Sequence, residues 1–399
     1  MTTIDLGPRT KAFRDELRQW LEANADDEAR SLQEERRPSR QPNEASKRWA
    51  DKLLEAKLIC VAWPEEFGGR GLTGIELAVL NEEFVRAGVP RVTRGMGEGL
   101  VGPSIIAHGT DEQKATFLPR IITGEDTYCQ GFSEPNSGSD LASLRTRGVV
   151  ENDEVVVNGQ KVWTSGYWAA NMLFCLCRTD PDAPPHRGIS YVLIPIRVDG
   201  QPNGIEFRPI KQMTGDANFA ETFLTDARAP LFNVIGGLGN GWRVAMTTLG
   251  NERGGNATTQ HLAFEREFWS LVELARDTGQ IEDPRVRDQL AWAYSHVELM
   301  RCQGQRILRT LAAGKQPDSG GAGSVNKVFW SEYQRRLGEI AMNLQGAGAL
   351  LVGPDYKLGR WQSTFLTTRS HTIWGGTAEI QRNIIAERIL GLPREPSVR

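Results

Sequence analysis

Two short segments carry the residue types that could bind a polar ligand. The stretch Tyr128–Asp140 (YCQGFSEPNSGSD) gathers glycines and small hydroxyl residues, which offer closely spaced backbone N–H groups and hydroxyls. Further along, Lys161–Gly166 (KVWTSG) supplies an aromatic plane followed by hydroxyls. A plain surface turn has the composition of the first segment, so neither segment identifies a ligand by itself.

A third feature is a carboxylate that could act as a general base. Residues at alternating three- and four-residue steps share one stripe of a helix. The stripe that includes Glu252 consists of Trp242, Ala245, Leu249, Glu252 and Asn256. An inward carboxylate is costly unless it has a partner or a chemical task, and the helical neighbours of Glu252 offer no cation. The alternative is a glutamate that reaches solvent or pairs with a distant arginine.

A fourth feature is the segment His371–Gln381 (HTIWGGTAEIQ), which places Gly375 and Gly376 where a helix begins. Two positions without side chains predict either an unusual backbone turn or a bulky group close by. Thr377 can cap the helix, and Gly391 can end it.

Other chemistries lack their motifs. The sequence has no HExxH, GxSxG or GxxxxGK[ST], and the cluster Gly236–Gly241 lacks the spacing of a dinucleotide site. The five histidines are isolated, and Cys175 and Cys177 lie two apart on an expected strand, so we expect no metal site. A net charge of −3 gives no reason to expect nucleic acid. We see neither a signal peptide nor a run long enough to span a membrane, which predicts a reduced, cytoplasmic enzyme.

Three kinds of segment must position these residues. Residues 1–125 show helical periodicity, residues 126–235 form short β-rich runs, and residues 236–399 return to helical patterns. The strands expected in the middle are 171–178, 188–196, 204–210 and 221–227. Asn158–Gly159 predicts a two-residue hairpin turn, and Pro317–Ser324 predicts a loop between helices. The sequence therefore predicts an α+β protein ordered as helices, antiparallel strands and helices.

The segments YCQGFSEPNSGSD, KVWTSG and GGTAEIQRNIIAERILG, in this order, resemble those of the acyl-CoA dehydrogenase family of flavoenzymes. The resemblance covers nearly the whole chain. It implies an N-terminal helical domain (1–125), a middle antiparallel domain like a β-barrel (126–235) and a C-terminal four-helix bundle (236–399). It also implies bound FAD and oxidation of an acyl-CoA thioester to trans-2-enoyl-CoA. Electron-transferring flavoprotein would accept the electrons, and the assembly would be a homodimer, a homotetramer or a heteromer.

Matched position by position, the resemblance assigns residues to the flavin ring. Phe132 and Ser133 match the stretch that hydrogen-bonds the pyrimidine side of the isoalloxazine. Trp163 matches the aromatic residue beside the ring. Ser165 matches the hydroxyl near flavin N5, where the family more often has threonine.

The rest of the cofactor is assigned in the same way. Gly138 and Ser139 match positions near the flavin phosphates and the substrate. Arg276 sits where the family has an arginine that reaches the FAD pyrophosphate of a neighbouring subunit, although the usual Phe-Gly beyond it is absent. The matches on the adenosine side are Gln345, Gly346, Thr377 and Glu379, and the family frequently has glutamine at the last position.

The family also has two places for its catalytic base. In many members, the residue before the final Gly-Thr is the glutamate that removes the α-proton of the substrate, and here that residue is Gly375. A subset places the glutamate on the helix after the β-domain, in a Glu-Arg pair that Glu252–Arg253 matches. The resemblance therefore implies Glu252 as the base. It implies Ser139, Arg253 and the backbone N–H of Gly375 as contacts to the substrate.

Two other functions stay open. A non-catalytic or half-site partner subunit of a heteromeric family member would share the fold. A flavin oxidase or monooxygenase on the same fold would differ in oxygen access, which the sequence does not show. The acyl group of the substrate stays open as well.

Overall fold

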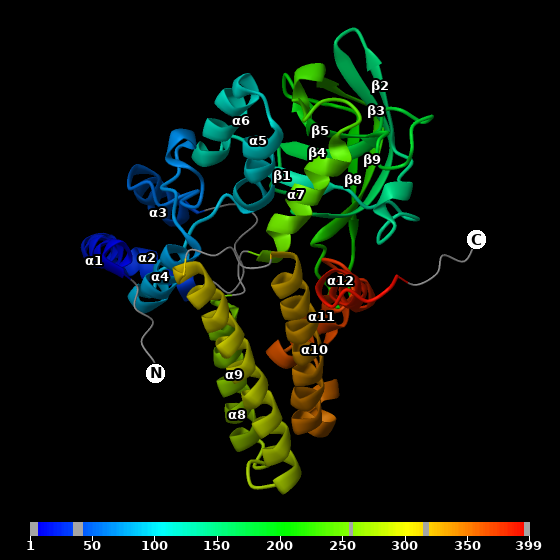
Figure 1. The fold of residues 1–399 in the computed structure, drawn as a ribbon. Helices are drawn as coiled ribbons and strands as arrows, with labels where there is room; N and C mark the ends of the chain where they lie inside the picture. The colour runs from blue at the N-terminus through cyan, green and yellow to red at the C-terminus, as the bar shows by residue number, and fades with distance from the viewer. Residues whose placement is uncertain (1–6, 35–42, 255–257, 314–318, 395–399) are drawn as a thin grey trace. The chain divides into compact units, whose positions relative to one another are not determined.

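The computed structural model describes residues 7–34, 43–254, 258–313 and 319–394 (Figure 1). It divides into two compact units. The first comprises Met1–Gln212 and Ala217–Glu252, and the second comprises Met213–Asp216 and Arg253–Arg399. No helix among the described residues is long and apolar enough to cross a membrane.

Helices form the N-terminal part of the first unit. They are α1 (Gly7–Asn24), α2 (Asp27–Glu34), α3 (Glu44–Glu55), α4 (Gly74–Ala87), α5 (Gly102–His108) and α6 (Asp111–Thr123). The apolar stripe of α1 is buried, with Phe13, Leu17 and Leu21 in the core. A capping box at Thr73 starts α4, and a left-handed Gly88 ends it. The helical periodicity expected over residues 1–125 is confirmed where the structure describes them, although α2 lies in the polar stretch 26–44, which we expected to be a surface excursion.

The middle of the chain forms an eight-stranded sheet and a separate two-stranded ribbon, β6–β7. The strands are β1 (Tyr128–Gly131), β2 (Arg147–Glu151), β3 (Glu154–Ser165), β4 (Met172–Arg178), β5 (Ile189–Pro195), β6 (Arg197–Val198), β7 (Gln201–Pro202), β8 (Ile205–Ile210), β9 (Phe219–Pro230) and β10 (Val234–Ile235). The order is β10-β5-β4-β2-β3-β9-β8, and β1 pairs with β4. All four expected strands are present.

The sheet is mostly antiparallel, as predicted, but β1 runs parallel to β4. Its two faces enter different cores. Phe174 and Leu176 of β4 join the core of the N-terminal helices, whereas Cys175 and Cys177 pack on the opposite face. This alternation follows from the two-residue period of a strand. Strands β4 and β5 are buried on both faces, and β4 pairs with every residue of β1.

The hairpin prediction at Asn158–Gly159 is wrong. The two-residue turn between β2 and β3 is Asn152–Asp153, where φ is +48° and +63° and where Glu151 pairs with Glu154. Such a turn needs positive φ at both central residues, and asparagine and aspartate tolerate it. Asn158–Gly159 instead forms a bulge inside the continuous strand β3. A Cβ at position 159 would lie 2.8 Å from Thr146 Cα, so this glycine permits close approach of two backbones.

Helix α7 (Gly241–Gly254) contains the boundary of the two units at Glu252, and helices form most of the second unit beyond it. Its helices are α8 (Gln260–Asp277), α9 (Pro284–Ala312), α10 (Ser319–Gln345), α11 (Arg360–His371) and α12 (Ala378–Ile384). Helices α8 to α11 bury their apolar faces in one core, which includes Phe268, Leu290, Leu337 and Trp361. The predicted loop Pro317–Ser324 is wrong for Ser319–Ser324, which form the first turns of α10. The long helix downstream overrides their weak local preference.

Candidate active site

The ends of β1 and β3 lie side by side. The backbone N–H of Val162 donates to the carbonyl of Ser133 at 2.9 Å, and Lys161 Nζ donates to the carbonyl of Phe132 at 3.1 Å. The ring of Phe132 packs edge-on against Phe174, with centroids 5.5 Å apart. The structure therefore brings together the two segments that the sequence suggested for ligand binding.

Trp163, near the end of β3, has a strained backbone conformation. Its φ is +64°, within the left-handed region that side chains with a Cβ rarely adopt, and β3 has a register shift between Lys161 and Thr164. Trp163 is 57% exposed, and its indole meets the ring of Phe219 edge-on, with centroids 6.2 Å apart. Strain of this kind persists where the surrounding structure fixes it, and it is frequent at binding sites.

The neighbours of Trp163 alternate across the sheet. Thr164 is fully buried, and its hydroxyl accepts a hydrogen bond from Thr222 at 2.7 Å. Ser165 is half-buried, and its hydroxyl lies 3.5 Å from the carbonyl of Trp163, at the outer limit of a hydrogen bond. The Ser165 hydroxyl is thus held only weakly within the chain, and it remains able to donate to a ligand.

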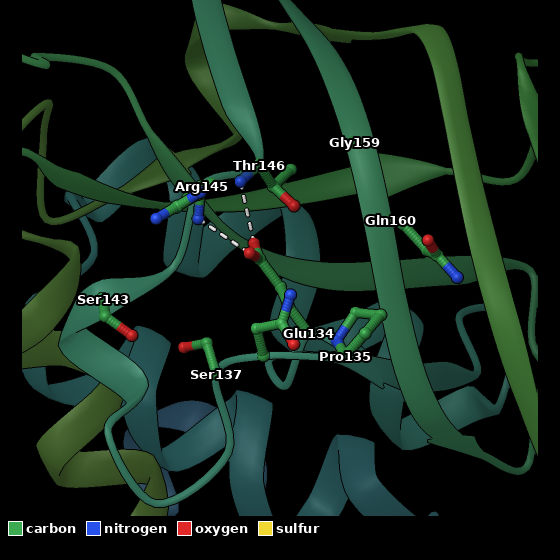
Figure 2. A pocket seen from close by; sticks show the side chains of 9 residues that line it. Glu134, Pro135, Ser137, Ser143, Arg145, Thr146, Gly159 and Gln160 are labelled. Carbon is green, nitrogen blue, oxygen red and sulfur yellow. Dashed lines mark hydrogen bonds between the residues drawn. The ribbon is translucent and has the colours of Figure 1, made fainter.

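Glu134 and Lys161 form an ion pair near the ends of β1 and β3. Lys161 Nζ lies 2.9 Å from Glu134 Oε1, and the Lys161 side chain is fully buried. The carboxylate also accepts from the backbone N–H groups of Arg145 (2.7 Å) and Thr146 (2.8 Å), toward which it points in Figure 2. Burial alone would raise the pKa of Glu134. The charge of Lys161 and these hydrogen bonds outweigh burial and hold the pKa below its ordinary value.

The loop after Glu134 borders a cavity of about 470 Å³, shown in Figure 2. Ser137 turns its hydroxyl inward and donates to the carbonyl of Asp140 at 2.9 Å, which fixes the loop. Gly138 and Ser139 are exposed on this loop, and a Cβ at Gly138 would meet nothing within 4 Å. Packing therefore does not require the glycine, which leaves its backbone open to a ligand.

Helix α7 carries Glu252 and Arg253 in its last turn. Trp242 and Leu249 pack against the core, and Ala245 is buried, which confirms the inward stripe over this part of the helix. The side chains of Glu252 and Arg253, and Asn256 as a whole, lie outside the described residues. Glu252 belongs to the same compact unit as the ends of β1 and β3.

In the second unit, both glycines of the segment His371–Gln381 are left-handed. The φ angles are +62° at Gly375 and +91° at Gly376, so the backbone turn itself calls for glycine. Gln381 Nε2 donates to the carbonyl of Gly375 at 3.2 Å. Thr377 caps α12 as predicted, because its hydroxyl accepts from the N–H of Ile380 at 3.2 Å.

The residues before this turn form a compact cluster. Lys327 Nζ donates to the carbonyl of His371 at 2.8 Å. The imidazole of His371 stacks on Trp374, with centroids 5.1 Å apart and an interplanar angle of 22°. Burial, together with the nearby charge of Lys327, lowers the pKa of His371 from 6.5 to about 4. The imidazole is therefore neutral at pH 7.

The remaining predicted residues of the second unit lie at helix ends. Gln345 ends α10, and its Oε1 is buried with no donor among the described residues. Gly346 follows with φ of +54°. Arg276 is exposed in the last turn of α8. Glu379 is exposed in the first turn of α12, where its own backbone N–H and the Thr377 hydroxyl lower its pKa.

Each unit by itself offers features that suit part of a bound cofactor. An exposed indole in a strained backbone offers a plane to an aromatic ring. The buried Gln345 Oε1 lacks a donor that a ligand hydroxyl or amine would supply. Sequence reasoning missed Lys161 and Glu134 as members of the site. A lysine between Gln160 and Val162 in a strand with a buried face was the available signal.

Comparison with known proteins identifies the class. Three family models match in succession: the N-terminal domain of acyl-CoA dehydrogenase over residues 7–125, the middle domain over 129–227 and the C-terminal domain over 239–390. The chain belongs to the acyl-CoA dehydrogenase family. It is accordingly an FAD-dependent oxidoreductase.

Individual members of the family resemble this chain over nearly its whole length. The chain is 43% identical to acyl-CoA dehydrogenase IpdE1 of Mycobacterium tuberculosis over 96% of this chain and 98% of that protein. It resembles the Tcur3481-Tcur3483 steroid ACAD with a TM-score of 0.78 and 29% identity, covering 98% and 100% of the two chains. It also resembles the ChsE4-ChsE5 complex from M. tuberculosis, with a TM-score of 0.77 and 29% identity, covering 99% and 100%.

Proposed function

We propose that this chain oxidises the Cα–Cβ bond of a bulky acyl-CoA thioester to the trans-2-enoyl-CoA, with Glu252 as the base. The observation that carries the proposal is the pairing of the β1 and β3 ends, which brings Phe132 and Ser133 beside the end of β3 that carries Trp163 and Ser165. FAD, when bound, accepts the hydride from Cβ. The chain's own residues must then bind the ring, orient the thioester and take the α-proton.

The ring would lie against Trp163, with the Phe132–Ser133 backbone on its pyrimidine side and the Ser165 hydroxyl donating to it. Gly138 and Ser139 would contact the phosphates. The residues proposed for the adenosine and pyrophosphate portions are Arg276, Gln345, Gly346, Thr377 and Glu379. Exposure of Trp163 and the weakly held Ser165 hydroxyl support the ring-side roles.

The proton transfer needs a carboxylate at the α-carbon. Gly375 has no side chain to provide one, and Glu252 lies at the end of α7 in the Glu-Arg pair of one family subset. Glu252 would take the α-proton as the C–H bond breaks, and the electron pair would become the Cα–Cβ double bond. The N–H of Gly375 would donate to the thioester carbonyl, which acquires negative charge in the transition state.

The proposed acyl group is steroid-like. Two observations support this class of acyl group: the resemblance to the Tcur3481-Tcur3483 steroid ACAD, and the missing side chain at Gly375. Loss of that side chain enlarges the space beside the α-carbon. Ser139 and Arg253 are the further residues proposed to contact the substrate. We propose electron-transferring flavoprotein as the electron acceptor.

The test is anaerobic bleaching of the flavin by acyl-CoA thioesters. The wild-type protein should bleach with a steroid-like acyl-CoA faster than with a straight-chain one. Glu252→Gln should retain FAD and bind acyl-CoA but bleach at least about 10²-fold more slowly, because only the proton acceptor is lost. Glu273→Gln, on α8, is the matched control and should bleach normally. Bleaching of Glu252→Gln at the wild-type rate would refute the assignment of the base.

A second candidate is a half-site subunit of a heteromeric enzyme. The observation that favours it is the resemblance to the two-protein ChsE4-ChsE5 complex. The alternative is a homodimer or homotetramer with every site complete. The FAD content of the purified chain and its mass in solution separate the two. One FAD per chain in a homo-oligomer excludes the half-site subunit.

A further inference from the structure

Lys161 is a lysine with no exposed side-chain surface in the middle of a sheet domain. Its ammonium group makes two contacts, to Glu134 Oε1 at 2.9 Å and to the carbonyl of Phe132 at 3.1 Å. Glu134 in turn accepts from the N–H groups of Arg145 and Thr146. One ion pair therefore joins three separate segments: the end of β1, the backbone before β2, and β3.

The location of the pair within β3 matters. Lys161 stands directly before the register shift that contains Trp163, and the N–H of Val162 is bonded to Ser133 between them. The positive φ of Trp163 is unfavourable unless the flanking backbone is fixed. Lys161 fixes it on one side, and the pairing of Thr164 with Ala220 fixes it on the other.

Stability alone does not account for such a pair. A buried ion pair seldom stabilises a protein more than well-packed apolar residues of similar volume would, because both charges lose their hydration. It does impose one arrangement, since its donors and acceptors must all be satisfied together. The contact to the Phe132 carbonyl ties that arrangement to the segment proposed to face the flavin.

We propose that Lys161 and Glu134 are positioning residues of the flavin site. The pair holds the Phe132–Ser133 backbone and the turn at Trp163 in the geometry that receives the isoalloxazine ring. This inference rests on the proposed assignment of these segments to the flavin. It does not depend on Glu252 or on the identity of the substrate.

The experiment compares three variants of the holoprotein. Lys161→Met removes the charge and both contacts at nearly constant length, and Glu134→Gln removes the charge but keeps an acceptor. Glu83→Gln is the matched control. Glu83 is a buried carboxylate of the N-terminal helices that pairs with Arg18 at 2.7 Å. The measurements are the FAD dissociation constant, from flavin fluorescence on dilution, the visible circular dichroism of bound flavin, and Tm.

We expect Lys161→Met to weaken FAD binding about tenfold or more and to alter the visible circular dichroism. Glu134→Gln should change the FAD affinity and the circular dichroism in the same direction as Lys161→Met, but to a smaller extent. Glu83→Gln should lower Tm while FAD affinity stays within about twofold of wild type. If Lys161→Met does not fold, the FAD affinity and spectrum of Glu134→Gln alone test the role of the ion pair. A variant of the pair that lowers Tm as the control does, with unchanged affinity and spectrum, would overturn the proposal.

The variant Trp163→Ala tests separately whether the flavin ring lies against these segments at all. An unchanged flavin spectrum in Trp163→Ala would mean that the isoalloxazine ring does not lie against the ends of β1 and β3. An altered spectrum there, with an unchanged one in Lys161→Met and Glu134→Gln, would refute the role of the ion pair alone.

Discussion

The hydroxyls of Ser104 on α5 and Thr248 on α7 lie 2.7 Å apart, and both side chains are fully buried. The Ser104 hydroxyl also lies 2.8 Å from the carbonyl of Leu100, in the turn before α5, and the Thr248 hydroxyl lies 3.2 Å from the carbonyl of Val244 in α7. One turn further along α5, His108 Nε2 meets Thr247 Oγ1 at 2.7 Å. Two consecutive threonines thus bind α7 to α5, one helical turn before Glu252.

We expect Thr248→Val and Ser104→Ala each to lower the free energy of unfolding by about 1 kcal/mol, because each removes a buried hydrogen bond. The double variant should lose less than the sum, by at least about 0.5 kcal/mol, since the two groups contact each other. Urea denaturation measures all three. Ser270→Ala, a serine hydroxyl exposed on α8, is the control and should change stability by less than about 0.5 kcal/mol. Strict additivity would show that the two hydroxyls do not interact.

The strain at Trp163 can be measured by comparing two replacements. Trp163→Ala removes the indole but keeps a Cβ at φ of +64°, whereas Trp163→Gly removes both. We expect the glycine variant, freed of FAD, to be more stable than the alanine variant by about 1 kcal/mol. Both should bind FAD more weakly than wild type. Equal stability of the two apoproteins would mean that this backbone conformation carries no strain.

Gly375 offers a test of the two family positions for the base. Gly375→Glu in the Glu252→Gln background should restore part of the flavin bleaching, because a carboxylate returns to the position that many family members use. Recovery should be incomplete, since φ of +62° costs a glutamate about 1–2 kcal/mol. Gly375→Gln in the same background carries the same strain without the charge, so it should remain inactive. Equal activity of these two double variants would exclude rescue by the carboxylate.

The lowered pKa of His371 should make the stability of the protein depend on pH. Its pKa falls from 6.5 in the unfolded chain to about 4 in the native state, so the unfolded state binds the proton first as pH decreases. The stabilisation is complete above pH 6.5 and is lost as pH falls toward 4. We expect a loss of about 2 kcal/mol, allowing for partial exposure of the ring.

The matched variant is His371→Phe, which keeps a ring against Trp374 but cannot titrate. The free energy of unfolding of wild type minus that of the variant, measured from pH 7 to pH 4, isolates the histidine. A constant difference over this range would contradict the buried, neutral imidazole.

Periodicity predicted the order of helices, antiparallel strands and helices. Helices such as α4 and α6 carry both an apolar stripe and a capping box, so local and tertiary preferences agree. The Asn-Gly signal failed because a longer-range requirement decided its use. Thr146 approaches Gly159 so closely that the glycine permits packing inside a strand, and the turn moved to Asn152–Asp153.

The site was only partly predictable. Residues that a motif names, such as Trp163 and Ser165, could be located because the segment is short and contiguous. The Lys161–Glu134 pair depends on which side chains face inward at a bulge and on the register of β3 with β9, which no local pattern specifies. The strain at Trp163 has the same origin.

The pairing of Ser165 with Phe219 has a consequence for biosynthesis. The segment that carries Trp163 acquires its shape only when β9, more than fifty residues later in the chain, has left the ribosome and docked. Contacts so distant in sequence form late, because the loop between them must close first. If the isoalloxazine ring lies against Trp163, as proposed, its binding surface is absent until β9 has paired with β3. On that assignment, we expect FAD to bind only after the β-domain is complete, so the cofactor would stabilise the finished domain rather than help it to form.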